Sequence, residues 1–187
     1  MKNYQITQWC HHFIREHVKK GDLCMDATAG NGNDTLLLCE LVGETGKVFA
    51  FDIQEQAVEN TKRRLEEGGV LERAEVLLDS HTNMSRYARE DSVSCIVFNF
   101  GYLPGGDHNL ATRKESSVAA IHEGLRLLKK GGIMSLCIYS GGDSGFDERY
   151  GILAELKQLN PKKYLVVLSE YYNRPNNPPI PVLVLKL

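Results

Sequence analysis

Apolar residues along the chain fall into short runs that alternate with longer segments of helical spacing. The short runs predict strands at 23–26, 47–51, 74–78, 94–100, 133–139, 164–170 and 182–187. The helical spacing predicts helices at 7–19, 33–41, 55–67, 114–128 and 148–159. The run at 94–100 is almost unbroken, as expected for a strand that is covered on both faces. Alternation of strand and helix predicts an α/β protein with a parallel sheet and right-handed crossovers.

The last two predicted strands have no helix between them, so we expect an antiparallel hairpin at one edge of the sheet. No internal repeat and no linker interrupts the chain, which predicts a single domain over 1–187. Seven strands that end in this way resemble the Rossmann-like class I methyltransferase fold. The resemblance implies the strand order 3-2-1-4-5-7-6, with helices on both faces of the sheet.

The stretch LCMDATAGNGNDT at 23–35 joins the first strand to the helix that follows it. Its strand ends at Asp26, and its turn holds Gly30 and Gly32, which allow the backbone to approach a ligand closely. Asn33 or Asp34 is expected to cap the helix. A strand, a glycine turn and a helix N-terminus in this order predict a nucleotide-cofactor site.

The details of this turn narrow the choice of cofactor. A dinucleotide fingerprint requires a third glycine, which is missing after Gly32, and the acidic residue here precedes the glycines, at Asp26. This arrangement is similar to methyltransferase motif I, with Thr28 in place of its first glycine. A carboxylate and backbone carbonyls near Asp26 suit the cationic amino group of S-adenosylmethionine. A nicotinamide-binding or non-catalytic Rossmann protein is the alternative from a different class.

Polar residues also follow the second and third predicted strands. Asp52 ends the second strand, where a carboxylate can accept both ribose hydroxyls, and Gln54 is placed to support it. Asp79, Ser80 and His81 end the third strand, beside the expected adenine pocket. Carboxylates at the ends of three successive strands favour a binding site over three unrelated helix caps.

Four motifs together resemble one bacterial family of proteins labelled rRNA methylases, at 26–35, 51–54, 79–81 and 99–107. Its members are tRNA wobble-uridine methyltransferases that convert 5-aminomethyl-(2-thio)uridine to 5-methylaminomethyl-(2-thio)uridine. The resemblance implies S-adenosylmethionine as cofactor, the tRNA anticodon loop as partner, and a homodimer. It places the cofactor contacts on Asn31, Asn33, Asp52, Gln54, Ser80 and His81.

The sequence NFGY at 99–102 echoes the N/D-P-P-Y/F motif of amino-methyltransferases, although Phe-Gly stands where that motif has two prolines. In that motif the Asn99 side chain accepts the hydrogens of the amine, and the Tyr102 ring stacks on the base. A neutral amine must present its lone pair for attack. Asp107 and His108 are the nearest candidates to accept the lost proton, and solvent is the alternative.

Substrate contacts are expected on the same side of the sheet. Tyr139 ends the fifth strand, and the stretch 171–179 combines aromatic, amide and cationic side chains that suit stacking on unpaired bases. A rigid proline hairpin is the competing interpretation of 171–179. The predicted substrate-binding residues are Arg113, Lys114, Tyr139, Asn173 and Arg174. Glycine-rich segments at 101–113 and 141–145 are candidates for functional loops.

Composition limits the remaining possibilities. The 187 residues carry a net charge of −2 and a pI near 6.3, which excludes a global positive field for nucleic acid. An rRNA base amine or a small-molecule amine are therefore alternative substrates. The pI slightly favours the small molecule, and the stacking-rich hairpin favours RNA. No apolar run is long enough for a membrane span. The odd number of scattered cysteines predicts a reducing, cytoplasmic compartment.

Several charged and sulfur-containing residues are predicted to be structural. The five cysteines are scattered without metal-ligand spacing, so they are interpreted as buried hydrophobic residues, and no metal site is predicted. His11 and His12 are expected to be exposed on the first helix, which packs on the sheet. Arg63 and Arg64 are expected on the solvated face of their helix.

Overall fold

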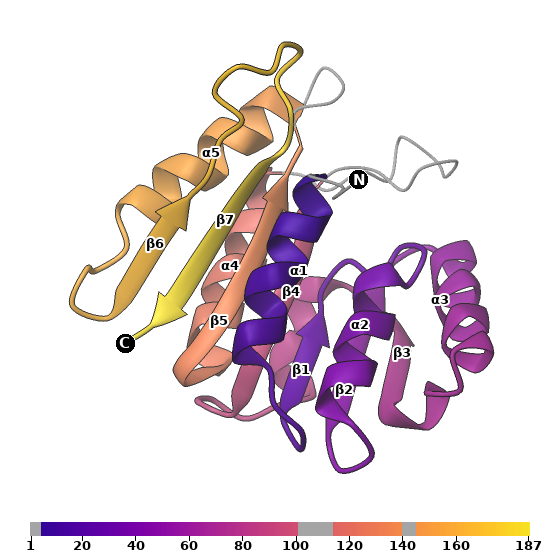
Figure 1. The fold of residues 1–187 in the computed structure, drawn as a ribbon. Coiled ribbons are helices and arrows are strands. Elements are labelled where there is room, and N and C mark those ends of the chain that lie inside the picture. Colours follow the sequence, from indigo (N-terminus) through magenta and orange to yellow (C-terminus); the bar gives the residue numbers. More distant parts are fainter. Residues whose placement is uncertain (1–4, 101–113, 140–144) are drawn as a thin grey trace.

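The computed structural model describes residues 5–100, 114–139 and 145–187 (Figure 1). The helices are α1 (Ile6–His17), α2 (Asn33–Val42), α3 (Glu55–Glu67), α4 (Lys114–Leu127) and α5 (Gly145–Lys157). Two short 3₁₀ helices are η1 (Leu71–Arg73) and η2 (His81–Arg86). The strands are β1 (Leu23–Asp26), β2 (Lys47–Asp52), β3 (Ala74–Leu78), β4 (Val93–Phe100), β5 (Leu128–Ile138), β6 (Tyr164–Leu168) and β7 (Ile180–Lys186).

The strands form one sheet in the order β3-β2-β1-β4-β5-β7-β6, which confirms the predicted order. Strands β1 to β5 are parallel to one another, and β7 runs antiparallel to both β5 and β6. The register pairs Asp26 with Ala50 on one side and with Val97 on the other. The carboxyl ends of β1, β2 and β4 therefore meet at one edge of the sheet, next to the turns that follow them.

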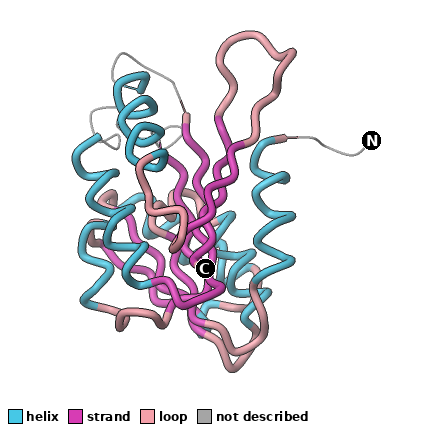
Figure 2. The backbone as a smooth tube through the Cα atoms, turned by 90° about the vertical axis from the view of Figure 1, so that its left-hand side faces the viewer, coloured by secondary structure: helices cyan, strands magenta, loops and turns pink. Residues whose placement is uncertain are grey.

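Helices cover both faces of the sheet, as predicted (Figure 2). One core cluster joins the sheet to α4 and α5, and a second joins it to α1, α2 and α3. Successive residues of β4 alternate between these clusters: Phe98 and Phe100 belong to the first, and Cys95 and Val97 to the second. This parity decides which helices can reach the residue at position 99.

Several boundaries differ from the predicted ones. β5 begins at Leu128 instead of 133, because its first residues continue the pairing with β4 beyond an irregularity between Val93 and Cys95. α5 begins at Gly145 instead of 148. The predicted loop at 101–113 and most of the one at 141–145 lie outside the described residues.

The structure bears on three features that the sequence analysis considered: the cysteines, membrane-spanning segments and metal ligands. All five cysteines are buried and unpaired by disulfides, which confirms that they pack as hydrophobic residues. Within 5–100, 114–139 and 145–187, no helix is both long and apolar enough to span a bilayer. The same ranges contain no cluster of three or more His, Cys, Asp or Glu side chains able to hold a metal ion.

Candidate active site

The turn after β1 has the backbone conformation that its glycines allow. Gly30 and Gly32 have φ angles of 55° and 73°, and Gly32 is the residue that precedes the first turn of α2. A Cβ atom added to Gly32 would lie 2.9 Å from the Thr61 Cα in α3. Asn33 and Asp34 were predicted to cap α2, and this is wrong, because the left-handed Gly32 occupies the cap position. The side chain of Asp34 is therefore available for other contacts.

Helix α3 holds the turn by its carbonyl groups. The Thr61 hydroxyl donates to the Gly30 carbonyl at 3.2 Å, and the Arg64 Nε donates to the Asn31 carbonyl at 2.5 Å. The Asn60 amide also donates to the Asn31 side-chain oxygen at 3.0 Å. The prediction that Arg64 lies on a solvated face is wrong, although the preceding arginine is exposed. Positions 60, 61 and 64 share one helix face, a spacing that indicates a common contact.

Asp52 is already oriented by the backbone. Its Oδ2 accepts from the Gly30 N–H at 2.9 Å, and its Oδ1 accepts from the Gln54 N–H at 3.0 Å. Each carboxylate oxygen has two lone pairs, so both retain capacity for a further donor such as a hydroxyl group. The side chain is partly exposed next to the glycine turn, which fits the predicted contact with a ribose.

Asp26 is fully buried beneath the turn. Its oxygens accept from the Thr35 hydroxyl at 2.6 Å and from the Thr28 N–H at 3.2 Å. Burial, reinforced by the nearby charge of Asp34 and less strongly by that of Asp52, raises the pKa of Asp26 to about 7. A carboxylate without exposed surface offers no direct contact with the cofactor amino group. Asp26 instead stabilises the turn from inside, while a contact through the nearby carbonyl groups stays a prediction.

His81 has one hydrogen-bond acceptor without a protein partner. Its Nδ1 lies 3.3 Å from the Ala27 carbonyl, which can only accept, so Nδ1 carries the proton. Burial lowers the pKa of His81, which leaves Nε2 as a neutral acceptor. Nε2 is buried and has no hydrogen-bond partner among the described residues. A ligand hydroxyl or amino group would satisfy it. Ser80 precedes it and caps η2 by accepting from the Thr82 N–H at 3.3 Å.

Asn99 lies at the carboxyl end of β4 and faces α1 and α2. Its backbone N–H donates to the Thr28 hydroxyl at 2.7 Å, an acceptor that a glycine at this motif position would not provide. Its side-chain Nδ2 donates to Asp34 Oδ2 at 2.5 Å. The other oxygen of Asp34 contacts the His11 Nε2. The predicted exposure of His11 is therefore wrong, whereas the neighbouring His12 is exposed as expected.

The predicted substrate-binding residues that the structure describes lie at the end of β5 or are exposed to solvent. The Tyr139 N–H donates to the Phe100 carbonyl at 3.2 Å, so Tyr139 lies beside the end of β4. Lys114 is exposed at the start of α4, and Asn173 and Arg174 are exposed in the connection between β6 and β7. The remaining predicted site residues, Tyr102, Asp107 and Arg113, lie outside the described residues.

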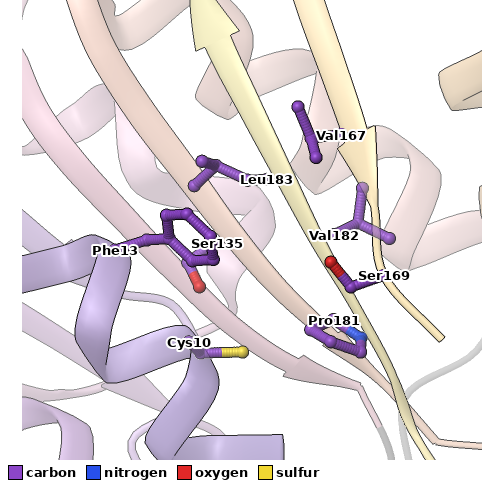
Figure 3. Close-up of a pocket in the computed structure, with 8 residues that line it drawn as sticks. All are labelled: Cys10, Phe13, Ser135, Val167, Ser169, Pro181, Val182 and Leu183. Atoms are coloured by element: carbon purple, nitrogen blue, oxygen red, sulfur yellow. The ribbon is translucent and has the colours of Figure 1, made fainter. Parts of the chain in front are cut away.

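Two cavities lie between α1 and the region of β5 to β7, away from the glycine turn. The smaller, about 10 Å³ in volume, is lined by side chains of α1 and the β5–β7 strands, among them Cys10, Phe13 and Leu183 (Figure 3). A volume of about 10 Å³ holds one water molecule at most. The larger cavity, about 260 Å³, is lined by residues such as Trp9 and Tyr171. Neither cavity includes a predicted cofactor residue, so both are separate from the glycine turn.

The residues at the turn fit a cationic adenosine cofactor. Of the acidic residues there, Asp26 is buried and Asp34 is engaged by Asn99 and His11, whereas Asp52 is partly exposed. The negative charge of Asp52 suits a cationic ligand such as S-adenosylmethionine. The unpartnered His81 acceptor and the backbone-oriented Asp52 suit its amino and hydroxyl donors. The residues that would hold the cofactor are Asp52, Gln54, Ser80, His81 and the turn from Gly30 to Asn33.

Strand order, glycine turn and acidic strand ends together define a class I methyltransferase that depends on S-adenosylmethionine, a class that also includes the solved relatives below. A family model described as "Putative rRNA methylase" matches residues 48–185, and the chain belongs to that family. The resemblance of its motifs to this family, and the predicted cofactor, are thereby confirmed.

Individual relatives agree with this assignment. The chain is 34% identical over 183 residues to the Arabidopsis thaliana tRNA (mnm(5)s(2)U34)-methyltransferase, chloroplastic, covering 93% of this chain and 67% of that protein. A "putative rRNA-methylase" from Clostridium thermocellum has 41% identity and a TM-score of 0.96, with both chains covered completely. A "putative methyltransferase" from Streptococcus mutans, solved in complex with SAH, has 32% identity and a TM-score of 0.89, with 99% of each chain covered.

Proposed function

We propose that this enzyme methylates the amine of 5-aminomethyl-(2-thio)uridine at the wobble position of tRNA, giving 5-methylaminomethyl-(2-thio)uridine and S-adenosylhomocysteine. The observation that carries the proposal is the Asn99 amide at the carboxyl end of β4, beside the glycine turn. Its Nδ2 is engaged by Asp34, so its other end is a carbonyl oxygen, which is the acceptor that an amine substrate requires. The name of the Arabidopsis relative supports the tRNA substrate.

The chain's own groups mainly orient the reactants. When bound, S-adenosylmethionine supplies an electrophilic methyl group on a sulfonium sulfur. Asn99 Oδ1 accepts one N–H of the neutral amine and so directs the nitrogen lone pair. The amine has lost one proton to solvent or to Asp107 before attack. After the new N–C bond forms and the S–C bond breaks, the product is a secondary ammonium.

Side chains around the same sheet edge are proposed to hold the RNA. Tyr139 at the end of β5 and the exposed Tyr172 offer rings for stacking on unpaired bases. Lys114 and Arg174 offer charges for phosphate groups, and the exposed Asn173 offers an amide for base edges. Because these cations are few, we expect tRNA affinity to be modest and to fall steeply with salt.

The test uses purified enzyme, S-adenosylmethionine and two anticodon stem-loops that differ only at the wobble position. One carries 5-aminomethyluridine and the other uridine, and the products are analysed by nucleoside mass spectrometry. Methylation of the first RNA alone is the expected result. Binding of adenosylhomocysteine without methylation of either RNA would overturn the proposed substrate. Ribosomal RNA fragments and free primary amines, assayed in parallel, then test the alternative substrates.

A further inference from the structure

The two carboxylate oxygens of Asp34 contact two different elements, β4 and α1, beside the carboxyl end of β4. Oδ2 accepts from the Asn99 amide at 2.5 Å, and Oδ1 contacts the Nε2 of His11. The side chains of His11 and Asp34 are only 13% and 12% exposed. The three residues come from α1, α2 and β4, and 65 positions separate Asp34 from Asn99.

The fold brings these side chains together by parity and strand order. Asn99 has the same parity in β4 as Cys95 and Val97, so it faces the layer of α1 and α2. Strand β1 is the neighbour of β4, so the helix that follows β1 begins beside the end of β4. Asp34 stands in the first turn of that helix.

The chemistry of the pair determines how the amide is turned. A carboxylate has only acceptors, so the amide group that faces Asp34 must be the NH₂ group. The backbone of Asn99 is fixed separately by its N–H bond to Thr28 at 2.7 Å. Rotation of the amide by 180° is then the main freedom that remains, and it would present NH₂ donors to the substrate amine.

We infer that Asp34, braced by His11, is a positioning residue that keeps the carbonyl oxygen of Asn99 directed at the substrate amine. This inference rests on the proposed function, because it names the groups that prepare Asn99 for an amine. Donation of Nδ2 to a carboxylate also polarises the amide and strengthens Oδ1 as an acceptor. His11 supports the arrangement by holding the second carboxylate oxygen.

The decisive experiment is a double-mutant cycle on methylation of the 5-aminomethyluridine stem-loop. Asp34→Asn keeps the size of the side chain. Its amide can present an NH₂ group to Asn99, so the Asn99 carbonyl oxygen is no longer required to face the substrate amine. We expect kcat to fall about 10-fold or more with KM for RNA little changed, because only the orientation of a reacting partner is lost. In an Asn99→Ala background, Asp34→Asn should cause no further loss, because the residue on which it acts is absent.

Variants of His11 supply a rescue test. His11→Gln retains an N–H donor for the Asp34 carboxylate, whereas His11→Ala does not, so the glutamine variant should keep more of the turnover. His12→Gln, on the exposed neighbour, is the matched control. Affinity for adenosylhomocysteine, measured by calorimetry, should stay within a few-fold of wild type in all of these variants.

Two kinetic results would overturn the inference: an Asp34→Asn enzyme with wild-type kcat, or an equal loss in both backgrounds of the cycle. Wild-type enzyme that leaves the stem-loop unmethylated would instead count against the proposed function. The amide orientation is then decided by NMR of the free protein with ¹⁵N-labelled asparagine. The Asn99 NH₂ signals should shift strongly in Asp34→Asn, and unchanged signals would reject the positioning role.

Discussion

The two halves of the candidate site are constructed differently. In the cofactor half, the turn after β1 is held by main-chain contacts: Asp52 accepts the N–H of Gly30, and α3 donates to the carbonyls of Gly30 and Asn31. In the acceptor half, which contains Asn99, the Asn99 side chain is held by one contact with the Asp34 side chain, which in turn contacts His11. Main-chain contacts orient a ligand that many members of a fold share, whereas side-chain contacts can change with the substrate.

This difference predicts how each half responds to mutation. Changes in the acceptor half should alter turnover and leave cofactor affinity intact. Changes in the cofactor half should alter cofactor affinity or folding and leave turnover at saturating cofactor nearly intact.

The largest effect is expected from Asn99→Ala in the acceptor half. Loss of the amide should lower turnover roughly 100-fold, the scale of a misplaced reacting group. Adenosylhomocysteine affinity should stay within a few-fold, because the cofactor half is untouched. Single-turnover kinetics and calorimetry measure the two quantities, and Asn160→Ala, in the loop before β6, is the control. Equal damage to affinity would show that the two halves are not separable.

The next effect tests the close approach of α3 to the turn. Gly32 and Gly131 have similar φ angles of 73° and 76°, but only Gly32 has a neighbour at 2.9 Å from an added Cβ. Gly131→Ala should therefore lower the free energy of unfolding by about 1 kcal/mol, the strain of the left-handed conformation. Gly32→Ala should lower it by a further ~2 kcal/mol from overpacking. Urea denaturation measures both, and identical losses would contradict the role of α3.

A smaller effect is expected for Asp52→Asn. The variant retains the side-chain shape but loses the charge, which should weaken adenosylhomocysteine binding about 10-fold, the low end for a hydrogen bond to a charged group. Turnover at saturating cofactor should change little. Asp91→Asn removes an exposed carboxylate that pairs with Lys186, and it serves as the control. An unaltered dissociation constant in Asp52→Asn would remove Asp52 from the cofactor half.

A further effect concerns the pH dependence of folding. The pKa of Asp26 is about 7 in the folded protein against an ordinary value of 3.8, so folding favours the protonated form. Its contribution to stability is complete below the ordinary value and is lost as the pH rises through about 7. Between these two values, the free energy of unfolding should fall by up to ~1.4 kcal/mol per pH unit. Asp26→Asn should reduce this pH dependence of the free energy of unfolding, measured by urea denaturation from pH 5 to 7. An unchanged dependence would assign it to another titratable group.

The features that were predicted correctly from the sequence are determined by residues close together in the chain. The apolar runs and turn residues indicated each strand, and the resemblance to the class I methyltransferase fold then implied the order that the sheet has. The glycine turn was visible because its residues are consecutive. Asp52 was visible because a carboxylate directly follows an apolar run, and that position is an edge of the sheet in any parallel α/β fold.

The residues whose surroundings were predicted wrongly make contacts with residues far away in the sequence. His11, Asp34 and Arg64 were assigned to surface or capping positions from their own helices, yet each contacts a residue far away in sequence. The separations are 23 positions for His11 with Asp34, 65 for Asp34 with Asn99, and 33 for Arg64 with Asn31. The expected strand order already placed the end of β4 beside the turn after β1, and this was the signal available for Asp34.

The sequence by itself therefore determined the order of the elements, the glycine turn and the class of cofactor. Hydrophobic period and turn chemistry act over a few residues, so they can be read along the chain. Only the tertiary structure decided that Asp26 is buried, that α3 supports the turn, and that Asp34 joins His11 to Asn99. Those results depend on which face of a strand each side chain occupies and on how closely two helices approach. The packing of the whole domain sets both.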